Sequence, residues 1–442
     1  MAYTMRVFKF RNTPEIALKI FLILCFFSGV IGVASAMLAM PVLKVWKEAF
    51  IVVLFIVALL FSQGKVSKKI IIPMAILIAI SIFAIYSMLD ILSSHTFIIL
   101  YQLKFDIIPV LFIVAVLLIF SKMSKDELLL FSIKLVKLVL FLGSLNAVAV
   151  ILQQIFPDSF MGLLGLDAGQ WGSDAGVRLN STEGNIRAIG LQLSFTMSGV
   201  LMLFCMILSI ECGRFIKSKF LKTFLFVLFL VAIICTTYKT AIIGVMVYFL
   251  VKFFEKFLPS ISKVAIFIIG LIILLFFVYS THDYAVYNSV RVYNQTAAYN
   301  SIYLRVLEHH NIIGSLDSLG KVLFGAGLGI NGTFGLDKTE YGITAIATDS
   351  AYIYLVSNYG YVGFFVYLFI LIYIQLKLFA IKACDIFGAR HLIFFTLVIE
   401  LFYNLGLGNF PNNILLIVFV AVPFVLKKKG CTKEDVAAYS YK

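Results

Sequence analysis

Two long polar segments, at about 156–189 and 281–349, hold the residues of this 442-residue chain that are best suited to chemistry. In the second segment tyrosines alternate with asparagines: Tyr284, Tyr287, Asn288, Tyr293, Asn294, Tyr299, Asn300 and Tyr303. An aromatic ring stacks on the apolar face of a sugar, and an amide hydrogen-bonds to its hydroxyl groups. The pattern therefore favours carbohydrate binding. The alternative is a tyrosine belt at a membrane surface, which explains each tyrosine singly better than it explains the group.

Arg187, Arg305 and Asp349 lie in these polar segments, and Lys239 lies at the outer end of another apolar run. Arg187 and Lys239 stand next to apolar runs, Arg305 lies in a stretch with helical spacing, and Asp349 directly precedes another apolar run. Each has a plainer alternative, because a cation at the end of a span can snorkel to lipid headgroups and an acid at a helix start is an ordinary cap. Gly190 favours a functional Arg187, since glycine lets a ligand or another backbone approach closely.

Two short patterns suggest cofactors or metals but lack the necessary context. The glycines of LFGAGLGI (Gly325, Gly327 and Gly329) lack the preceding strand, the complete six-residue motif and the βαβ setting of a dinucleotide site. A tight turn that exposes backbone N–H groups is the better interpretation. His309 and His310 are adjacent and have no spaced Cys or Asp partners, so a metal site is not expected. We expect neither cofactor nor metal.

The rest of the chain is composed to sit in a lipid bilayer. Hydrophobic residues make up 62% of it, charged residues 13%, and the mean hydropathy is +1.05. A helix needs roughly 20 apolar residues to cross the hydrocarbon core, and unbroken runs favour helices over a barrel. The sequence predicts an all-α protein with about twelve transmembrane helices, at 15–39, 49–62, 70–89, 105–121, 131–155, 190–211, 223–238, 240–258, 264–280, 350–376, 391–408 and 414–426. These runs are poor in acids, so we expect the chemistry outside them.

The distribution of cations predicts the orientation. If the N-terminus is cytoplasmic, 23 of the 36 Lys and Arg residues fall in inside segments and 10 in outside ones, as the positive-inside rule requires. Lys44 and Lys47, in the first outer loop, oppose the rule. Both termini are therefore expected in the cytoplasm, with 1–442 forming one integral membrane domain and the two polar segments forming long periplasmic loops. The net charge of +14 is spread between apolar runs, so nucleic acid is not an expected partner.

Five short motifs, in this order, resemble the O-antigen polymerase and ligase superfamily, in which Wzy-type polymerases act on lipid-linked sugars. They cover about residues 170–370 and are Arg187–Ala188–Ile189–Gly190, Thr236 to Lys239, Arg305 with Phe324–Gly325–Ala326–Gly327, Thr348–Asp349–Ser350–Ala351–Tyr352, and Tyr359–Gly360–Tyr361–Val362–Gly363. Ligases of the superfamily tend to carry a histidine, and often an asparagine, where this chain has Asp349–Ser350, which favours the polymerase. Lys239 stands where relatives often have Ser-Arg, so the charge is kept but the bidentate fork is lost.

The resemblance implies a substrate and a reaction. The substrate is an oligosaccharide repeat on undecaprenyl pyrophosphate, and the reaction is a glycosyl transfer on the periplasmic face of the bacterial inner membrane. Arginines stabilise the charge that develops on a pyrophosphate leaving group, so the resemblance gives this role to Arg187 and Arg305, with Lys239 assisting. Asp349 becomes the base that takes a proton from the acceptor hydroxyl. Other candidates for substrate binding are Arg178, Arg291, Tyr299, Tyr303 and Tyr352.

Two alternatives stay open beside a polymerase of O-antigen or a similar surface polysaccharide. One is a ligase that transfers the glycan to lipid A core or to protein. The other is a flippase or exporter of the same lipid-linked sugar, which should carry cations in a cavity along its spans. As partners, the resemblance implies the lipid bilayer, a chain-length regulator and a flippase.

Overall fold

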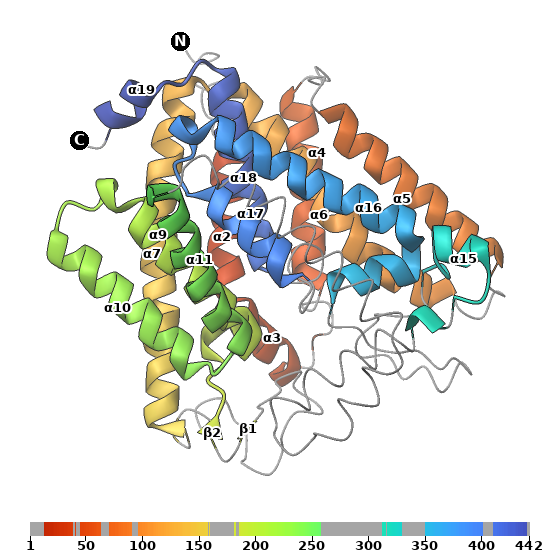
Figure 1. The fold of residues 1–442 in the computed structure, drawn as a ribbon, viewed down its shortest axis with the longest axis horizontal. Helices are drawn as coiled ribbons and strands as arrows, with labels where there is room; N and C mark the ends of the chain where they lie inside the picture. Colours follow the sequence, from red (N-terminus) through yellow and green to blue (C-terminus); the bar gives the residue numbers. More distant parts are fainter. Residues whose placement is uncertain are drawn as a thin grey trace.

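The chain folds into a bundle of helices (Figure 1). The computed structural model describes residues 13–38, 40, 45–62, 70–90, 96–157, 159, 181–182, 185–257, 312–314, 316–328, 350–400 and 410–439. Among these residues the only strands are β1 (Ser181–Thr182) and β2 (Asn185–Ile186), which form one antiparallel pair. The run predicted at 264–280 lies outside the described residues.

The first predicted span is broken into two helices, α2 (Thr13–Phe26) and α3 (Ser28–Met37), which meet at an angle of 71°. A break leaves carbonyl groups of the first helix without their normal partners. Gln192 supplies them, because its side-chain amide donates to the carbonyl oxygens of Cys25 and Phe26 at 3.3 and 2.8 Å. The backbone of Gln192 also lies so close to Gly29 that a Cβ there would overlap it. The break is therefore built into the packing.

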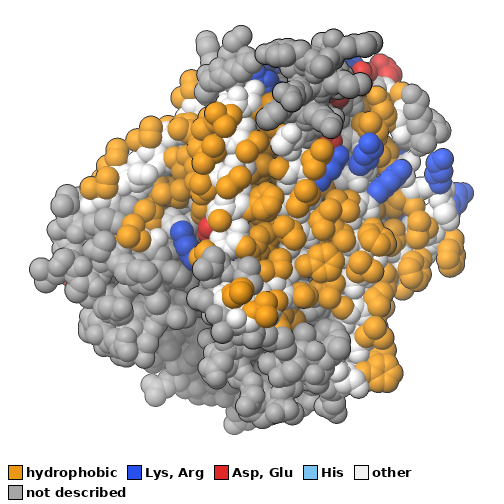
Figure 2. All heavy atoms as spheres, turned by 180° about the vertical axis from the view of Figure 1, so that it is seen from behind, with side chains coloured by type: hydrophobic (Ala, Val, Ile, Leu, Met, Phe, Trp, Pro, Cys, Tyr) orange, Lys and Arg blue, Asp and Glu red, His pale blue; other side chains and the backbone are white. Residues whose placement is uncertain are grey.

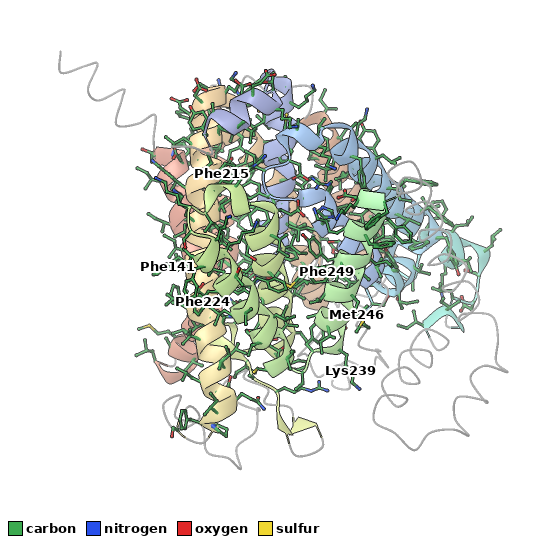
Figure 3. All side chains as sticks on the ribbon, turned by 60° about the vertical axis from the view of Figure 1, so that its left-hand side comes forward. Phe141, Phe215, Phe224, Lys239, Met246 and Phe249 are labelled. Carbon is green, nitrogen blue, oxygen red and sulfur yellow. The ribbon has the colours of Figure 1, made fainter. Side chains whose placement is uncertain are left out.

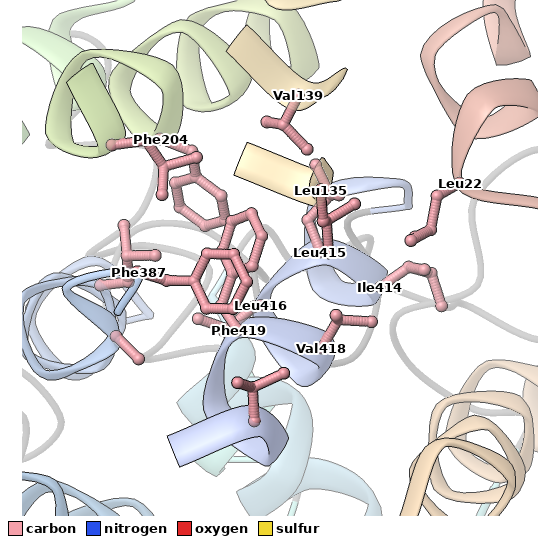
Figure 4. Packing of buried hydrophobic residues seen from close by; sticks show 14 of the residues in the cluster. Leu22, Leu135, Val139, Phe204, Phe387, Ile414, Leu415, Leu416, Val418 and Phe419 are labelled. Carbon is pink, nitrogen blue, oxygen red and sulfur yellow. The ribbon is translucent and has the colours of Figure 1, made fainter. Parts of the chain in front are cut away.

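The helices fall into two groups on either side of a central set (Figure 1). One group comprises α7 (Lys125–Ile155), α9 (Phe195–Glu211), α10 (Lys219–Cys235) and α11 (Lys239–Phe257). The other comprises α4 (Trp46–Ser62), α5 (Ile71–Asp90), α6 (Thr96–Lys122), α15 (Leu319–Phe324) and α16 (Ala351–Ala380). Between them lie α2, α17 (Ala389–Ile399) and α18 (Asn412–Lys428), and the short α19 (Lys433–Ala438) follows. Figure 4 shows the core where α7, α9 and α18 meet; there Phe387 stacks on Phe419 at 4.6 Å between ring centroids.

Within the described part of the chain, three helices are long and apolar enough to cross a membrane: Gln102–Lys122, Lys125–Ile155 and Ala351–Ala380. The bent pair α2–α3 makes a fourth if it counts as one span. The runs predicted at 49–62, 70–89, 190–211, 223–238, 240–258 and 414–426 also coincide with helices, which are shorter or less apolar. Large apolar side chains remain exposed on them, among them Leu60 at 75% and Phe220 at 80%. Apolar side chains cover much of the described surface in Figure 2. Apart from the short β1–β2 pair, the regular structure of the described residues is helical, and its exposed apolar surface is that of a membrane protein.

Several cation-bearing helix ends meet at one end of the bundle. Lys125 at the start of α7 pairs with Asp435 of α19 at 2.7 Å, and Lys429 donates to the Ser121 carbonyl in the last turn of α6 at 3.0 Å. The hydrogen bond to Lys125 lowers the pKa of Asp435. The thiol of Cys384, after α16, donates to the carbonyl of Cys431, after α18, at 3.2 Å. The positive-inside rule assigns the cations of these segments to one side of the membrane. In the structure the segments lie together at one end of the bundle.

Candidate functional site

The segment Arg187–Gly190 is held at the opposite end of the bundle by buried amide side chains of α7. The Gln153 side-chain oxygen accepts from the N–H groups of Ile189 and Gly190 at 2.7 and 3.1 Å, and that of Asn146 accepts from Leu191 at 2.8 Å. Both amides are 0% exposed. Hydrogen bonds between a backbone and buried side chains hold that backbone in one conformation. The segment that carries Arg187 is therefore rigid rather than a loose loop.

Gly190 is required at its position. Its φ is +56°, and a Cβ there would overlap the side chains of Asn146 and Val150. Only glycine adopts this region without strain. The sequence analysis expected Gly190 to allow a ligand or another backbone to approach closely. In the structure, the part that approaches Gly190 is α7 of the same chain.

Arg187 and Lys239 lie at this same end of the bundle. The guanidinium of Arg187 lies over the Phe195 ring at 4.7 Å, a cation–π distance. The ring of Phe195 in turn packs edge-on against Tyr238 at 5.9 Å, and Tyr238 directly precedes Lys239. Figure 3 shows Lys239 at the opposite end of the helices from Phe215. Partial burial lowers the pKa of Arg187, and Lys239 is exposed at the start of α11.

The turn between α10 and α11 is also fixed in place. Thr237 has a φ of +49°, which is strained for a β-branched residue. Thr236 is buried and its hydroxyl donates to the carbonyl of Ile233 at 2.7 Å, while the N–H of Ala188 donates to the carbonyl of Cys235 at 3.4 Å. The Arg187–Gly190 motif is therefore hydrogen-bonded to Cys235, the residue directly before the Thr236–Lys239 motif.

Two further motifs pack against each other, because α15 and the following glycine turn lie on the kink of α16. Gly360, with φ +67° and ψ −173°, interrupts the helical backbone of α16. A Cβ on Gly360 would overlap the backbone of Leu323 and Phe324, and one on Gly325 would overlap the backbone of Asn358. The N–H of Ala326 donates to the Ser357 carbonyl at 2.8 Å. The LFGAG turn is thus a structural support of α16.

The first half of α16 carries a buried polar network that the sequence analysis missed. Asp106 of α6, 2% exposed, accepts from the hydroxyls of Tyr354 at 3.0 Å and Tyr359 at 2.5 Å. The side-chain amide of Gln102, one helical turn earlier, donates to that of Asn358 at 2.9 Å. A buried acid, hydrogen-bonded to partners on α16, therefore lies within α6, in a run that the sequence analysis described as poor in acids. The i, i+4 spacing of Gln102 and Asp106 was the available signal.

Tyr352, predicted to bind substrate, is 0% exposed in the core, and its hydroxyl donates to the Leu397 carbonyl at 2.7 Å. Ser350 is the N-cap of α16, since its hydroxyl oxygen accepts from the N–H of Ile353 at 3.3 Å. Its hydroxyl also donates to the carbonyl of Glu400 at 3.1 Å. The cap that the plainer alternative gave to Asp349 is therefore supplied by Ser350.

Six predicted site residues lie outside the described part of the chain: Arg178, Arg291, Tyr299, Tyr303, Arg305 and Asp349. Among the predicted site cations that the structure describes, Arg187 and Lys239 lie at the same end of the helix bundle. The described residues contain no group of three or more His, Cys, Asp or Glu placed to hold a metal ion.

A second network missed by the sequence analysis lies at the cation-rich end. Arg390 of α17 is buried and pairs with Asp385 at 3.2 Å, with Glu211 of α9 at 3.2 Å and with Glu255 of α11 at 3.1 Å. Lys252 adds an ion pair to Glu211 at 2.7 Å. Burial raises the pKa of Asp385, which lies in the turn before α17. One guanidinium thus ties three helices together.

No family model, curated protein or solved structure matches this chain.

Proposed function

We propose that this protein is a polytopic inner-membrane glycosyltransferase that polymerises oligosaccharide repeats carried on undecaprenyl pyrophosphate. The observation that carries the proposal is the meeting of Arg187 and Lys239 at one end of the bundle, on backbone segments that contact each other directly. Two cations on rigid backbone suit a site that stabilises charge on a phosphate leaving group.

The proposed topology has twelve spans with both termini in the cytoplasm. The end at which Lys125, Lys429 and Arg390 lie faces the cytoplasm under the positive-inside rule, so the Arg187 end faces the periplasm. No nucleotide is needed there, because the pyrophosphate linkage of the donor already stores the energy of transfer.

In the proposed reaction a hydroxyl oxygen of the acceptor sugar forms a bond to the anomeric carbon of the donor. The bond from that carbon to the pyrophosphate oxygen breaks, and undecaprenyl pyrophosphate leaves with the electron pair. Arg187, Lys239 and Arg305 stabilise the charge on the leaving group, and Asp349 takes the hydroxyl proton. Ser350 caps α16, so the cap itself does not require Asp349.

The experiment is deletion of the gene followed by analysis of the surface polysaccharide. A polymerase deletion leaves lipid A core bearing a single repeat, because flipping and ligation continue. A flippase deletion leaves no repeat at the surface, and a ligase deletion leaves polymer on the carrier lipid. Either of the last two results would replace the proposed function by the corresponding alternative.

A further inference from the structure

A small pocket opens beside the start of α18, between α4 and α6. Its charged lining residues are Lys47, Glu48 and Lys104, and its walls include Phe410 and Asn413. Lys104 lies 3.5 Å from the carboxylate of Glu48, and the ammonium group of Lys47 lies over the Phe410 ring at 4.7 Å. The lining therefore carries two positive charges against one negative charge.

The pocket also receives the positive end of a helix. Asn413 and Ile414 in its wall belong to the first turn of α18, and the N-cap residue Pro411 supplies no side-chain cap. The N–H of Ile414 donates to the side-chain oxygen of Asn413 at 2.8 Å, so the helix contributes the dipole of its N-terminus and not that N–H group. The N-terminus of a 17-residue helix favours an anion. Two lysines and the first turn of a helix line one pocket, and these are elements of a phosphate site.

Lys47 is also one of the two cations, with Lys44, that oppose the orientation rule. It lies at an outer loop of the proposed topology, where the rule disfavours cations. A role in binding an anion accounts for a lysine at this position.

The pocket and the Arg187 segment lie on two sides of the same helix start. Asn413 lines the pocket, while the side-chain amide of the adjacent Asn412 donates to the carbonyl of Met197 at 3.1 Å, in the first turn of α9. Phe195, on which Arg187 stacks, lies two residues before Met197. The first turn of α18 therefore contacts both the Lys47–Lys104 pocket and the first turn of α9, which carries the Phe195 ring under Arg187.

We infer that the Lys47–Lys104 pocket binds the phosphate head of a second polyprenyl-pyrophosphate lipid, the carrier of the acceptor glycan. The inference rests on the proposed function, since a polymerase joins two carrier-linked glycans and must hold two pyrophosphate heads at once. Arg187 and Lys239 hold the donor head, and Lys47 and Lys104 hold the acceptor head.

Trp46 gives a direct readout of the pocket, because its ring packs edge-on against Phe410 at 5.9 Å. The chain has two tryptophans, so a Trp171→Phe background leaves Trp46 as the single fluorophore. The full-length protein is placed in nanodiscs of neutral phosphatidylcholine and titrated with farnesyl pyrophosphate, inorganic pyrophosphate and farnesol. We expect a saturable change in Trp46 emission with farnesyl pyrophosphate, a weaker one with pyrophosphate and none with farnesol.

The variants test the charges. Lys47→Gln and Lys104→Gln should each weaken farnesyl pyrophosphate binding about 10- to 100-fold, the value of one charge-assisted hydrogen bond. Lys219→Gln, in the first turn of α10 at the other end of the bundle, should change nothing. Glu48→Gln removes the negative charge and should tighten binding, a gain that misfolding cannot produce.

Three outcomes would overturn the inference: binding that is unchanged in both lysine variants, weaker binding in Glu48→Gln, or pyrophosphate binding as tight as farnesyl pyrophosphate binding, which indicates a site for free phosphate.

Because the titration needs no turnover, it is independent of the deletion experiment. Arg187→Ala should stop polymerisation and leave the Trp46 response intact. A normal polymer in the deletion strain would overturn the proposed function without affecting the Trp46 result.

Discussion

Gly325 and Gly360 hold α15 and α16 in backbone-to-backbone contact. A Cβ added to either glycine would overlap the backbone of the other segment. Both have positive φ, +83° and +67°. The contact explains why two glycine motifs about 35 residues apart occur together. They form one joint, and the joint sets the direction of the first half of α16.

Gly360→Ala should therefore destabilise the protein. The positive φ alone costs about 1–3 kcal/mol for a residue with a Cβ, and the overlap with Leu323 adds to it. We expect a lower midpoint in thermal unfolding of the purified protein and a shorter polysaccharide ladder at equal membrane abundance. Gly320→Ala is the matched control, since a Cβ at Gly320 in α15 meets nothing within 4 Å. Equal stability of the two variants would contradict the joint.

Asp106 should be coupled to the tyrosines of α16. Asp106→Ala leaves the hydroxyls of Tyr354 and Tyr359 buried without their acceptor, at about 1–3 kcal/mol for each. Asp106→Asn keeps one acceptor oxygen and should cost less. A double-mutant cycle on thermal stability between Asp106→Ala and Tyr359→Phe checks the contact, because the second change removes the stranded donor. Additive effects would show that the two side chains do not interact.

Arg390 should be the most sensitive residue at the cation-rich end. Arg390→Ala strands the buried acids Asp385, Glu211 and Glu255, and breaking a buried pair costs about 3–5 kcal/mol. Arg390→Lys should rescue only part of this loss, because a point charge cannot bond to three carboxylates as a guanidinium does. Arg214→Ala, an exposed arginine at the same end, should stay within about 0.5 kcal/mol of the parent. The measurement is thermal unfolding in a defined detergent. A small loss of stability in Arg390→Ala would mean that water already solvates the three acids.

The sequence predicted helix positions better than it predicted contacts. The start of α16 next to Ser350 and the start of α11 at Lys239 follow from local changes in polarity, which a sequence displays directly. The predicted run at 105–121 began nine residues after the true start of α6, because Gln102, Lys104 and Asp106 interrupt the hydropathy. Those side chains are tolerated in the helix because partners from α16 and α4 satisfy them, and no local pattern reveals such partners.

The same limit applies to the site. Arg187 and Lys239 could be named as candidates because each stands at a span border, and the structure adds that they lie at the same end of the bundle. The amide groups of Asn146 and Gln153 that hold the Arg187 segment could not, since they lie within an apolar helix and look like isolated polar residues. The network around Arg390 joins residues that are up to 179 positions apart in the sequence, and only the tertiary packing of α9, α11 and α17 shows that they belong together.

The arginines carry the sharpest test of the proposed chemistry. If Arg187 and Arg305 bind the pyrophosphate, removal of either one deletes a charge-assisted contact worth about 2–5 kcal/mol, which slows transfer roughly 30-fold to several thousand-fold at 1.36 kcal/mol per tenfold. Lysine should rescue only in part, because it cannot form two parallel hydrogen bonds. The activity at each position should therefore fall in the order Arg, Lys, Ala.

Lys321→Ala is the matched control for these arginines. It is a cation of the same polar segment as Arg305, but it pairs with exposed Asp317 at 2.9 Å along one helix turn, a contact worth about 0.2–0.5 kcal/mol. The readout is the surface polysaccharide ladder of a deletion strain that carries each variant at equal membrane abundance. Lys321→Ala should give the parental ladder, and Arg187→Ala and Arg305→Ala should leave single repeats. A parental ladder from Arg305→Ala would remove that arginine from the site, and one from Arg187→Ala would remove the observation on which the proposed function rests.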